Sequence, residues 1–357
     1  MKKNALLIIV LFSGIAAWQC SKQTVSGPGT TTSLKASLNT GSQKLIQAVS
    51  NITQSKGYEI LTLNSSLKSA PLQDDAIFKD SITLSGIKGI YEYQPVTYRH
   101  WCYGCFTKLF KKTGDTSLLI AKLPSDKIFH PSRFQTVVAA DSTLKNNFVI
   151  SATAYHYYFN MGFLHDYKLT AGVKVSDTAV GNIDIQSVAT SLSNYASSTA
   201  FSFPSGYTLN SSVKSGDTAS LSFSISSPTE TLLKETVNLI KTQGSKFHEK
   251  QYILDIGNVE IVKSSVTDSF KIYVSGVLQT NAKVEVIDNT SSTEQVSIFR
   301  NRDIQITFDD GTKTTISALI GPSFAILENL ATSIQDVYFA SNIVNYIAWN
   351  IYKNRIQ

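Results

Sequence analysis

The chain of 357 residues has few of the residues that usually form redox, metal and anion-binding sites. It contains three cysteines and five histidines, and only 16% of its residues are charged. The lysines are spread along the chain without a basic cluster, so nucleic acid is not an expected partner. No glycine-rich phosphate loop, His-Glu-x-x-His or Gly-x-Ser-x-Gly motif is present, so the common signatures of nucleotide-binding proteins and hydrolases are missing. We therefore expect no metal ion and no cofactor.

Long apolar runs are also missing, apart from one near the N-terminus. Residues Ala5–Trp18 are largely apolar and follow Lys2 and Lys3. About fourteen residues at a rise of ~1.5 Å reach roughly 21 Å, which is shorter than the ~30 Å hydrocarbon core of a bilayer. The segment therefore predicts a cleaved secretory signal rather than a spanning helix.

Cys20 comes shortly after this apolar run and favours a lipoprotein signal, in which residues 1–19 are removed and the cysteine carries the lipid. Trp18 and Gln19 depart from the small residues usual before such a cysteine, so simple secretion is the alternative. Two acyl chains on Cys20 would anchor the protein stably to a membrane. Residues 20–32 are rich in Ser, Thr, Gly and Pro and predict a flexible tether.

Residues 33–357 are expected to form one large domain or two closely packed β subdomains. Over Ser81–Leu319 apolar residues recur at every second position, most clearly in Ser220–Ile225, and this period is typical of half-buried strands. A helix is expected over about Ser42–Lys56, with Gly57 placed to end it. We therefore predict an α+β fold, mainly antiparallel β-sheet with an N-terminal helix and a long C-terminal helix.

The C-terminal segment predicts the clearest helix of the chain, starting after Gly321-Pro322 with Ser323 as its cap and ending near Lys353. Apolar residues recur along it at a three-four spacing and form a seam, with Ser333 as the one polar interruption. We expect this seam to pack across the sheet of the same molecule; pairing with another chain is the alternative. The members of the seam are Ile326, Leu330, Val337, Ala340, Val344, Ile347 and Ile351.

Three turn signals between predicted strands indicate hairpins: Gly114-Asp115, Gly216-Asp217 and Asp310-Gly311. The phrase Lys112–Thr116 is echoed by Lys214–Thr218, which fits a duplicated unit or, more simply, shared turn chemistry. Residues 230–241 fit both a strand and a helix, and we predict a strand because strands surround them.

The segment Trp101–Cys105 is similar to the Trp-Cys-x-x-Cys motif of thioredoxin-like oxidoreductases. Once Cys20 is lipidated, Cys102 and Cys105 are the remaining thiols, and an oxidising envelope would pair them. A redox role calls for a helix over about Thr107–Lys112 that lowers the thiol pKa. The βαβ surroundings of that family are missing, so we favour a structural disulfide across a hairpin loop, and a redox-active pair is the alternative.

The segment Thr307–Gly311 is similar to the first motif of polysaccharide deacetylases, in which paired aspartates serve a metal ion and proton transfer. That family also needs two metal-binding histidines downstream, and no histidine follows His248. The alternation of Ile304, Ile306 and Phe308 into Asp310-Gly311 instead indicates a hairpin.

The stretch Tyr155–Phe159 is aromatic and is followed by the pair His165-Asp166. Exposed aromatic rings on a sheet stack on sugar rings or bases, and a His-Asp pair suits acid-base chemistry. The alternation from Phe148 to Tyr158, which includes Ala154 and His156, instead places that set of side chains towards a core. We favour core packing together with ordinary exposed tyrosines.

Three parts of the chain resemble those of one family: Cys20-Ser21, Gly89–Tyr93 leading through Trp101 to Leu118–Pro124, and Phe203–Tyr207. The family is the uncharacterised lipoproteins of the Bacteroidota. The resemblance implies no catalytic residues, because that family has no assigned activity. Some members carry an acidic run after the cysteine that directs them to the cell surface. This chain has Ser-Lys-Gln-Thr there, so the resemblance implies an outer-membrane lipoprotein that faces the periplasm.

We therefore predict a non-enzymatic lipoprotein of the cell envelope with a binding or structural role. Its partners would be the membrane, through the lipid on Cys20, and a small-molecule, glycan or protein ligand. The alternative is an envelope enzyme, either a thiol-disulfide reductase that uses Cys102 and Cys105 or a glycan-active hydrolase.

Overall fold

The computed structural model describes residues 33–62, 81–94, 109–125, 145–160, 164–191, 193–241, 247–265, 269–288 and 302–356. Leu34–Gln357 form one compact unit. Within the described ranges, fifteen strands form one sheet and three more form a second sheet. Strands make up 52% and helices 28% of the structure, and helices stand at both ends of the unit, so the predicted α+β fold is confirmed.

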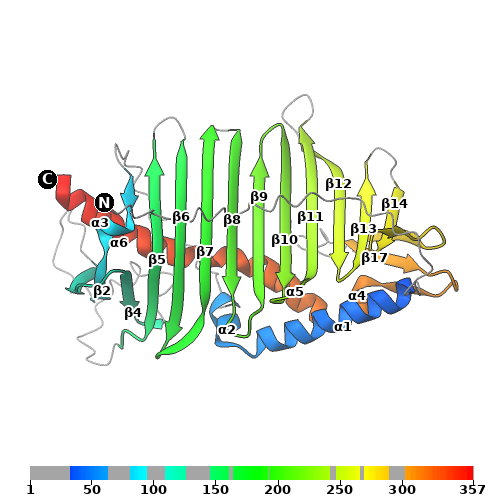
Figure 1. Cartoon of the computed structure of the whole chain (residues 1–357), viewed down its shortest axis with the longest axis horizontal. Coiled ribbons are helices and arrows are strands. Elements are labelled where there is room, and N and C mark those ends of the chain that lie inside the picture. The colour runs from blue at the N-terminus through cyan, green and yellow to red at the C-terminus, as the bar shows by residue number, and fades with distance from the viewer. Residues whose placement is uncertain are drawn as a thin grey trace, which may run out of the picture. The chain divides into compact units, whose positions relative to one another are not determined.

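From β5 to β15, each strand of the large sheet pairs antiparallel with the next strand along the chain. Figure 1 shows most of these strands side by side. The segment predicted as a strand at residues 230–241 is β11. The strands are β5 (Phe148–Phe159), β6 (His165–Val175), β7 (Thr178–Ser191), β8 (Asn194–Ser202), β9 (Thr208–Ser215), β10 (Thr218–Ser226), β11 (Thr231–Lys241), β12 (Phe247–Ile256), β13 (Val259–Ser264), β14 (Ser269–Val274) and β15 (Val277–Leu278).

The other edge of the sheet has a different topology. Here β4 (Leu119–Leu123) pairs with β5, and β2 (Gly89–Tyr93) lies between β4 and the edge strand β3 (Phe110–Gly114). The pairing of β2 with β4 is parallel. The short β1 (Ile82–Thr83) also pairs with β5 and leads into α3 (Leu84–Ile87).

One of the three predicted hairpins is wrong. Gly114-Asp115 joins β3 to β4, which are separated by β2 and therefore form no hairpin. Gly216-Asp217 joins β9 to β10, and Asp310-Gly311 joins β17 to β18, and both of these pairs are antiparallel neighbours. The echo of Lys112–Thr116 in Lys214–Thr218 thus occurs in two different kinds of connection. This difference favours shared turn chemistry over a duplicated unit.

The small sheet consists of β16 (Lys283–Asp288), β17 (Arg302–Thr307) and β18 (Lys313–Thr315), followed by α4 (Ile316–Ile320). Asp303 of β17 is buried, and its side chain contacts α4. Its carboxylate accepts hydrogen bonds from the backbone N–H of Ile304 at 2.9 Å, from the backbone N–H of Ser317 at 3.2 Å and from the Ser317 hydroxyl. Because these bonds satisfy a buried carboxylate, we assign Asp303 a structural role.

The N-terminal helix begins earlier and ends earlier than predicted. It is α1 (Leu34–Thr53), and α2 (Lys56–Thr62) follows after a short break. Gly57 does not end α1 but lies inside α2. A Cβ atom at Gly57 would stand 2.8 Å from both the Phe203 ring and the Val180 carbonyl oxygen. The glycine is therefore needed for the close approach of α2 to the sheet, and not for a helix C-cap.

The C-terminal helix is divided into α5 (Ser323–Ser333), the 3-10 helix η3 (Ile334–Val337) and α6 (Tyr338–Ile356). Ser323 is the first residue of α5, and the N-cap is Pro322, which makes no side-chain cap bond. The seam packs on the large sheet of the same chain, as predicted. Its middle members are buried: Leu330, Val337, Ala340, Val344 and Ile347.

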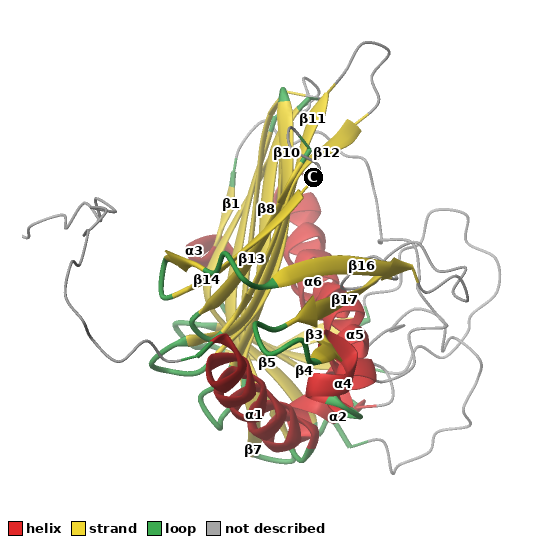
Figure 2. Ribbon diagram, turned by 90° about the vertical axis from the view of Figure 1, so that its right-hand side faces the viewer, coloured by secondary structure: helices red, strands yellow, loops and turns green. Residues whose placement is uncertain are grey.

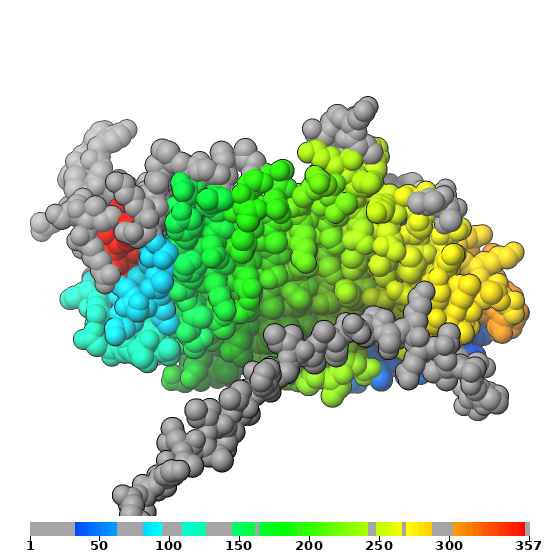
Figure 3. All heavy atoms as spheres, turned by 45° about the horizontal axis from the view of Figure 1, so that its top comes forward, coloured from blue at the N-terminus to red at the C-terminus, as the bar shows by residue number. Residues whose placement is uncertain are grey.

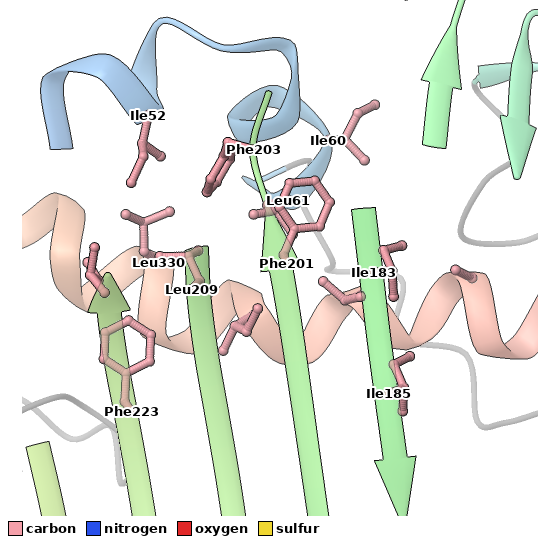
Figure 4. Close-up of a cluster of buried hydrophobic side chains, with 14 of the residues drawn as sticks. Ile52, Ile60, Leu61, Ile183, Ile185, Phe201, Phe203, Leu209, Phe223 and Leu330 are labelled. Atoms are coloured by element: carbon pink, nitrogen blue, oxygen red, sulfur yellow. The ribbon is translucent and has the colours of Figure 1, made fainter. Parts of the chain in front are cut away.

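The main core lies between the large sheet and the helices. Figure 4 shows Ile52 of α1 and Leu61 of α2 facing Phe201 and Leu330. Phe201 is fully buried, and its ring lies 4.9 Å from that of Phe203, measured between centroids. Apolar burial at this interface holds the helices on one face of the sheet.

Candidate functional site

The large sheet presents two different faces. The helices α4, α5 and α6 and the small sheet lie on one side of it (Figure 2), and we call that side the covered face. The other side, which we call the open face, is turned towards the viewer in Figure 1. Figure 3 shows the surface of the sheet as one broad, continuous area from the green strands to the yellow strands.

Strand register arranges the side chains of the open face in rows that cross the sheet from β7 to β11. In an antiparallel sheet, residues that stand directly opposite each other point to the same face. The first row is Gln186, Ser198, Ser212, Ser222 and Thr236; the second is Asp184, Ala200, Asn210, Ser224 and Lys234; the third is Asn182, Ser202, Thr208, Ser226 and Thr231.

The alternating sequence of β10 explains how one strand serves both faces. Phe223 and Ile225 are buried on the covered face, whereas Ser222 and Ser224 are half-buried on the open face. Leu221, nearer the end of the strand, is 39% exposed and belongs to the covered face by register. Since side chains alternate with a period of two, the serines of β10 all point away from the helices.

Nine open-face residues at the centre of the sheet carry no charge, and we call them the neutral patch. All of them except Ala200 bear a hydroxyl or an amide group. Ser202 and Thr208 share a hydrogen bond of 3.0 Å between their hydroxyl oxygens. The members are Ser198, Ala200, Ser202, Thr208, Asn210, Ser212, Ser222, Ser224 and Ser226.

Four side chains of the neutral patch keep unused hydrogen-bonding capacity. Ser198, Asn210, Ser212 and Ser224 make no side-chain hydrogen bond to any other residue in the described part of the chain, unlike Ser202, Ser222 and Ser226. A hydroxyl group both donates and accepts, and an amide offers two donors and an acceptor. These groups can therefore bind water or a polar ligand without breaking a contact of the protein.

Charged side chains flank the neutral patch on both sides. On β7, Asp184 accepts hydrogen bonds from the Thr170 hydroxyl at 2.8 Å and from the Gln186 amide at 2.9 Å. On β12, Asp255 stands directly opposite Glu260 of β13. Burial raises the pKa of Asp255 above its ordinary value, and the charge of Glu260 raises it further. Lys168 of β6 stands opposite Gln186 and Lys234 of β11 stands opposite Asp255, so the flanks carry both signs of charge.

The predicted alternation of β5 is wrong in its second half. The pairing with β6 shifts register between Ala152 and Ala154, so Tyr155 is buried against the helices and His156 lies on the open face. The Tyr155 hydroxyl donates a hydrogen bond of 2.9 Å to Asn345 of α6. A β-bulge of this kind inserts one residue and exchanges the two faces of the strand beyond it.

The alternation of β6 separates His165 from Asp166, the pair considered for acid-base chemistry, because consecutive residues of a strand point to opposite faces. His165 points to the covered face, where its ring stacks on Tyr167 with 6.2 Å between centroids. Burial lowers the pKa of His165, an effect that the charge of Asp166 partly opposes. Asp166 instead lies on the open face, with its carboxylate 3.4 Å from Nε2 of His156. The structure thus pairs Asp166 with a histidine from the neighbouring strand.

The aspartates at 309 and 310 lie in the hairpin between β17 and β18, as predicted. Asp310 accepts hydrogen bonds from the backbone N–H of Thr312 at 2.9 Å and from the Thr312 hydroxyl at 2.5 Å. Lys35 donates to the same carboxylate at 3.1 Å. These contacts lower the pKa of Asp310 to about 2. The Asp-Asp-Gly segment is accordingly a turn with local hydrogen bonds and an ion pair.

The three cysteines, Cys20, Cys102 and Cys105, lie outside the described residues. Their lipidation and disulfide therefore stay predictions. The helix that a redox role calls for over Thr107–Lys112 is not formed in the described part of that segment, because Phe110–Gly114 is the edge strand β3.

The described residues contain neither a candidate metal site nor a candidate membrane-spanning helix. No cluster of three or more His, Cys, Asp or Glu side chains suited to a metal ion occurs in the described ranges. No helix among the same residues has both the length and the apolar character needed to cross a membrane.

Comparisons with known proteins give no family model, no curated protein and no solved structure that matches this chain. The resemblance to Bacteroidota lipoproteins therefore stays a prediction.

Proposed function

We propose that this chain is a non-enzymatic lipoprotein of the cell envelope that binds its ligand through the open face of the large sheet. The observation that carries the proposal is the contrast between the two faces. The covered face buries apolar side chains under helices, whereas the centre of the open face offers rows of short polar side chains. Polar groups with unused hydrogen-bonding capacity on a broad sheet suit recognition of an extended ligand.

The architecture supports a binding role because the core lies between the helices and the covered face alone. Phe201, Leu209 and Ile225 are fully buried on the covered face. The open face therefore contributes little to stability, and its residues are available for contact with a partner. The separation of His165 from Asp166 onto opposite faces also supports a role in binding over one in acid-base catalysis.

The membrane part of the proposal rests on the N-terminal sequence. Cys20 would carry the lipid, and residues 20–32 would link it to the unit that begins at Leu34. We propose the outer membrane as the location, with the protein facing the periplasm. Mass spectrometry of the membrane fraction is expected to find a diacylglycerol-modified N-terminal cysteine. A Cys20→Ala variant is expected to leave the membrane fraction; retention there would contradict the anchor.

Binding through the open face is tested with purified envelope material from the producing cells. The mature protein is incubated with this material and sedimented, and a Ser212→Arg variant is compared with a Ser205→Arg variant. Ser212 is central in the neutral patch, whereas Ser205 is exposed in the turn between β8 and β9. We expect cosedimentation to be lost only in Ser212→Arg. Equal cosedimentation of the two variants would contradict the proposal.

A second candidate function is a glycan-active hydrolase, and it rests on Asp255 and Glu260. Residues directly opposite on antiparallel strands have Cβ atoms about 4.5–5.5 Å apart. The carboxyl groups of Asp255 and Glu260 therefore lie on the same face of neighbouring strands, glycosidases act with a pair of carboxyl groups, and burial raises the pKa of Asp255 above its ordinary value. Release of reducing ends from soluble polysaccharides, abolished in Asp255→Asn, would favour this function over simple binding.

A further inference from the structure

We propose that the ligand of the open face is an uncharged, linear polysaccharide that lies along the rows of the neutral patch, across strands β7 to β11. This inference rests on the proposed function and names the chemical class of the ligand.

The first argument is the chemistry of the neutral patch. Its side chains are short, and nearly all of them end in a hydroxyl or an amide group. A polysaccharide presents hydroxyl groups that donate and accept along its whole length. Each unpaired hydroxyl of Ser198, Ser212 and Ser224 can therefore meet either a donor or an acceptor on such a chain. A ligand with acceptors only, such as a polyphosphate, would leave half of this capacity unused.

The second argument is charge complementarity. On β8 to β10 the three rows contain no charged residue, and Lys214 of β9 lies on the same face in the next row, between Ala196 and Ser220. Acidic and basic side chains stand on both flanks, with Lys168 and Asp184 on one side and Lys234 and Asp255 on the other. An anionic polymer across the patch would meet carboxylates at both ends, and a cationic one would meet lysines. An uncharged chain avoids both penalties.

The third argument is geometry. Strands lie about 4.8 Å apart, so the row from Gln186 to Thr236 spans roughly 19 Å across five strands. The spacing between strands is similar to the length of one sugar residue in an extended chain. Successive sugar residues can therefore meet successive strands, and the row repeats similar contacts at Ser198, Ser212 and Ser222. A polymer is favoured over a single sugar because each strand contributes only one short side chain to a row.

The test uses the mature protein, purified in detergent, and affinity electrophoresis in gels that contain one polysaccharide each. The uncharged probes are linear β-glucan, xylan, mannan and galactan, and the charged probes are polygalacturonate and dextran sulfate. We expect retardation by at least one uncharged probe. Ser212→Arg, which places a long charged side chain in the patch, is expected to weaken this binding by ~tenfold or more, whereas Ser205→Arg is expected to bind like the wild type.

A second variant guards against an indirect effect of the arginine. Asn210→Ala removes the amide of the patch without adding bulk and is expected to weaken the same binding while the circular dichroism spectrum stays unchanged. Binding of charged probes alone, or equal binding by Ser212→Arg and Ser205→Arg, would overturn the inference.

The outcomes also separate this inference from the proposed function. If no polysaccharide binds, but cosedimentation with envelope material still depends on Ser212, the ligand is of another class and the binding role stands. Treatment of that material with protease would then test for a protein partner. If cosedimentation is also independent of Ser212, both the inference and the proposed function fail.

Discussion

The two faces of the large sheet are made by the same strands, but different forces act on them. On the covered face, Phe201 and Ile225 are buried under helices, and their transfer from water stabilises the fold. On the open face, their neighbours Ser202 and Ser224 stay partly exposed and touch no helix of the core. We infer that stability is concentrated on one face and that the other is available for binding. The following predictions test this contrast, from the largest expected effect to the smallest.

The largest effect is expected from Phe201→Ala on the covered face. Removal of this ring leaves a cavity between Phe203 and α2. We expect the free energy of unfolding to fall by about 3–5 kcal/mol. The measurement is urea denaturation. The matched control is Ser224→Ala on the open face, which removes a hydroxyl without a side-chain hydrogen bond in the described part of the chain, with an expected change within about 0.5 kcal/mol. Similar losses in both variants would contradict the contrast.

A smaller loss is expected from Gly57→Ala in α2. The new methyl group would lie 2.8 Å from the Phe203 ring and from the Val180 carbonyl oxygen, so α2 must move away from the sheet. We expect the free energy of unfolding to fall by about 1–3 kcal/mol in thermal or urea denaturation. In the control Gly216→Ala the nearest atom is 3.7 Å away, and little change is expected. A stable Gly57→Ala variant would show that the contact is not tight.

The pH dependence of stability is expected to reflect His165. Burial holds its pKa below the ordinary value of 6.5, so the folded state favours the neutral ring. The contribution of the neutral His165 ring to the free energy of unfolding is complete above about pH 6.5. It is lost as the pH falls through the lower pKa that His165 has in the folded state. Denaturation at about pH 7.5 and about pH 5.5 should show the wild type less stable at the lower pH. His165→Phe, which keeps the ring beside Tyr167, should reduce this difference; an unchanged difference would exclude His165 as its source.

The smallest effect is expected on the open face. Ser212→Thr adds one methyl group at a half-buried position of the open face, and we expect the free energy of unfolding to change by no more than about 0.5 kcal/mol. Ser187→Thr adds the same group on the covered face, where Ser187 is only 7% exposed, and a loss of about 1 kcal/mol or more is expected. Equal values for the two variants in thermal denaturation would show that the two faces are packed alike.

Much of the fold could be predicted from local patterns. The strands of the β region and the C-terminal seam follow from apolar periods of two and of about three and a half, which are visible in a short stretch of sequence. The first part of α1, before Ser42, was not predicted because its buried face contains small residues, Ser37 and Gly41. Close packing of this part of α1 against β12 favours small residues, since a Cβ atom at Gly41 would lie 3.0 Å from the carbonyl oxygen of Ile256.

The candidate site was harder to predict than the fold. The serines of β10 were recognised as one side of a strand, but their position beside Ser212 and Thr236 depends on pairing with two other strands. The β-bulge after Ala152 placed His156 on the same face as Asp166, whereas the alternation of β6 put His165 on the other face. No local signal in the sequence marks that bulge, because the extra residue is specified by the pairing with β6.

The sequence by itself determined which side chains share a face within each strand, because the period of two is a property of the single chain. It also determined that the C-terminal helix carries an apolar seam. Only the tertiary structure decided that α5 and α6 cover one face and leave the neutral patch open, and which residues from different strands form each row. The physical reason is that apolar burial and strand register depend on contacts between segments far apart in the sequence.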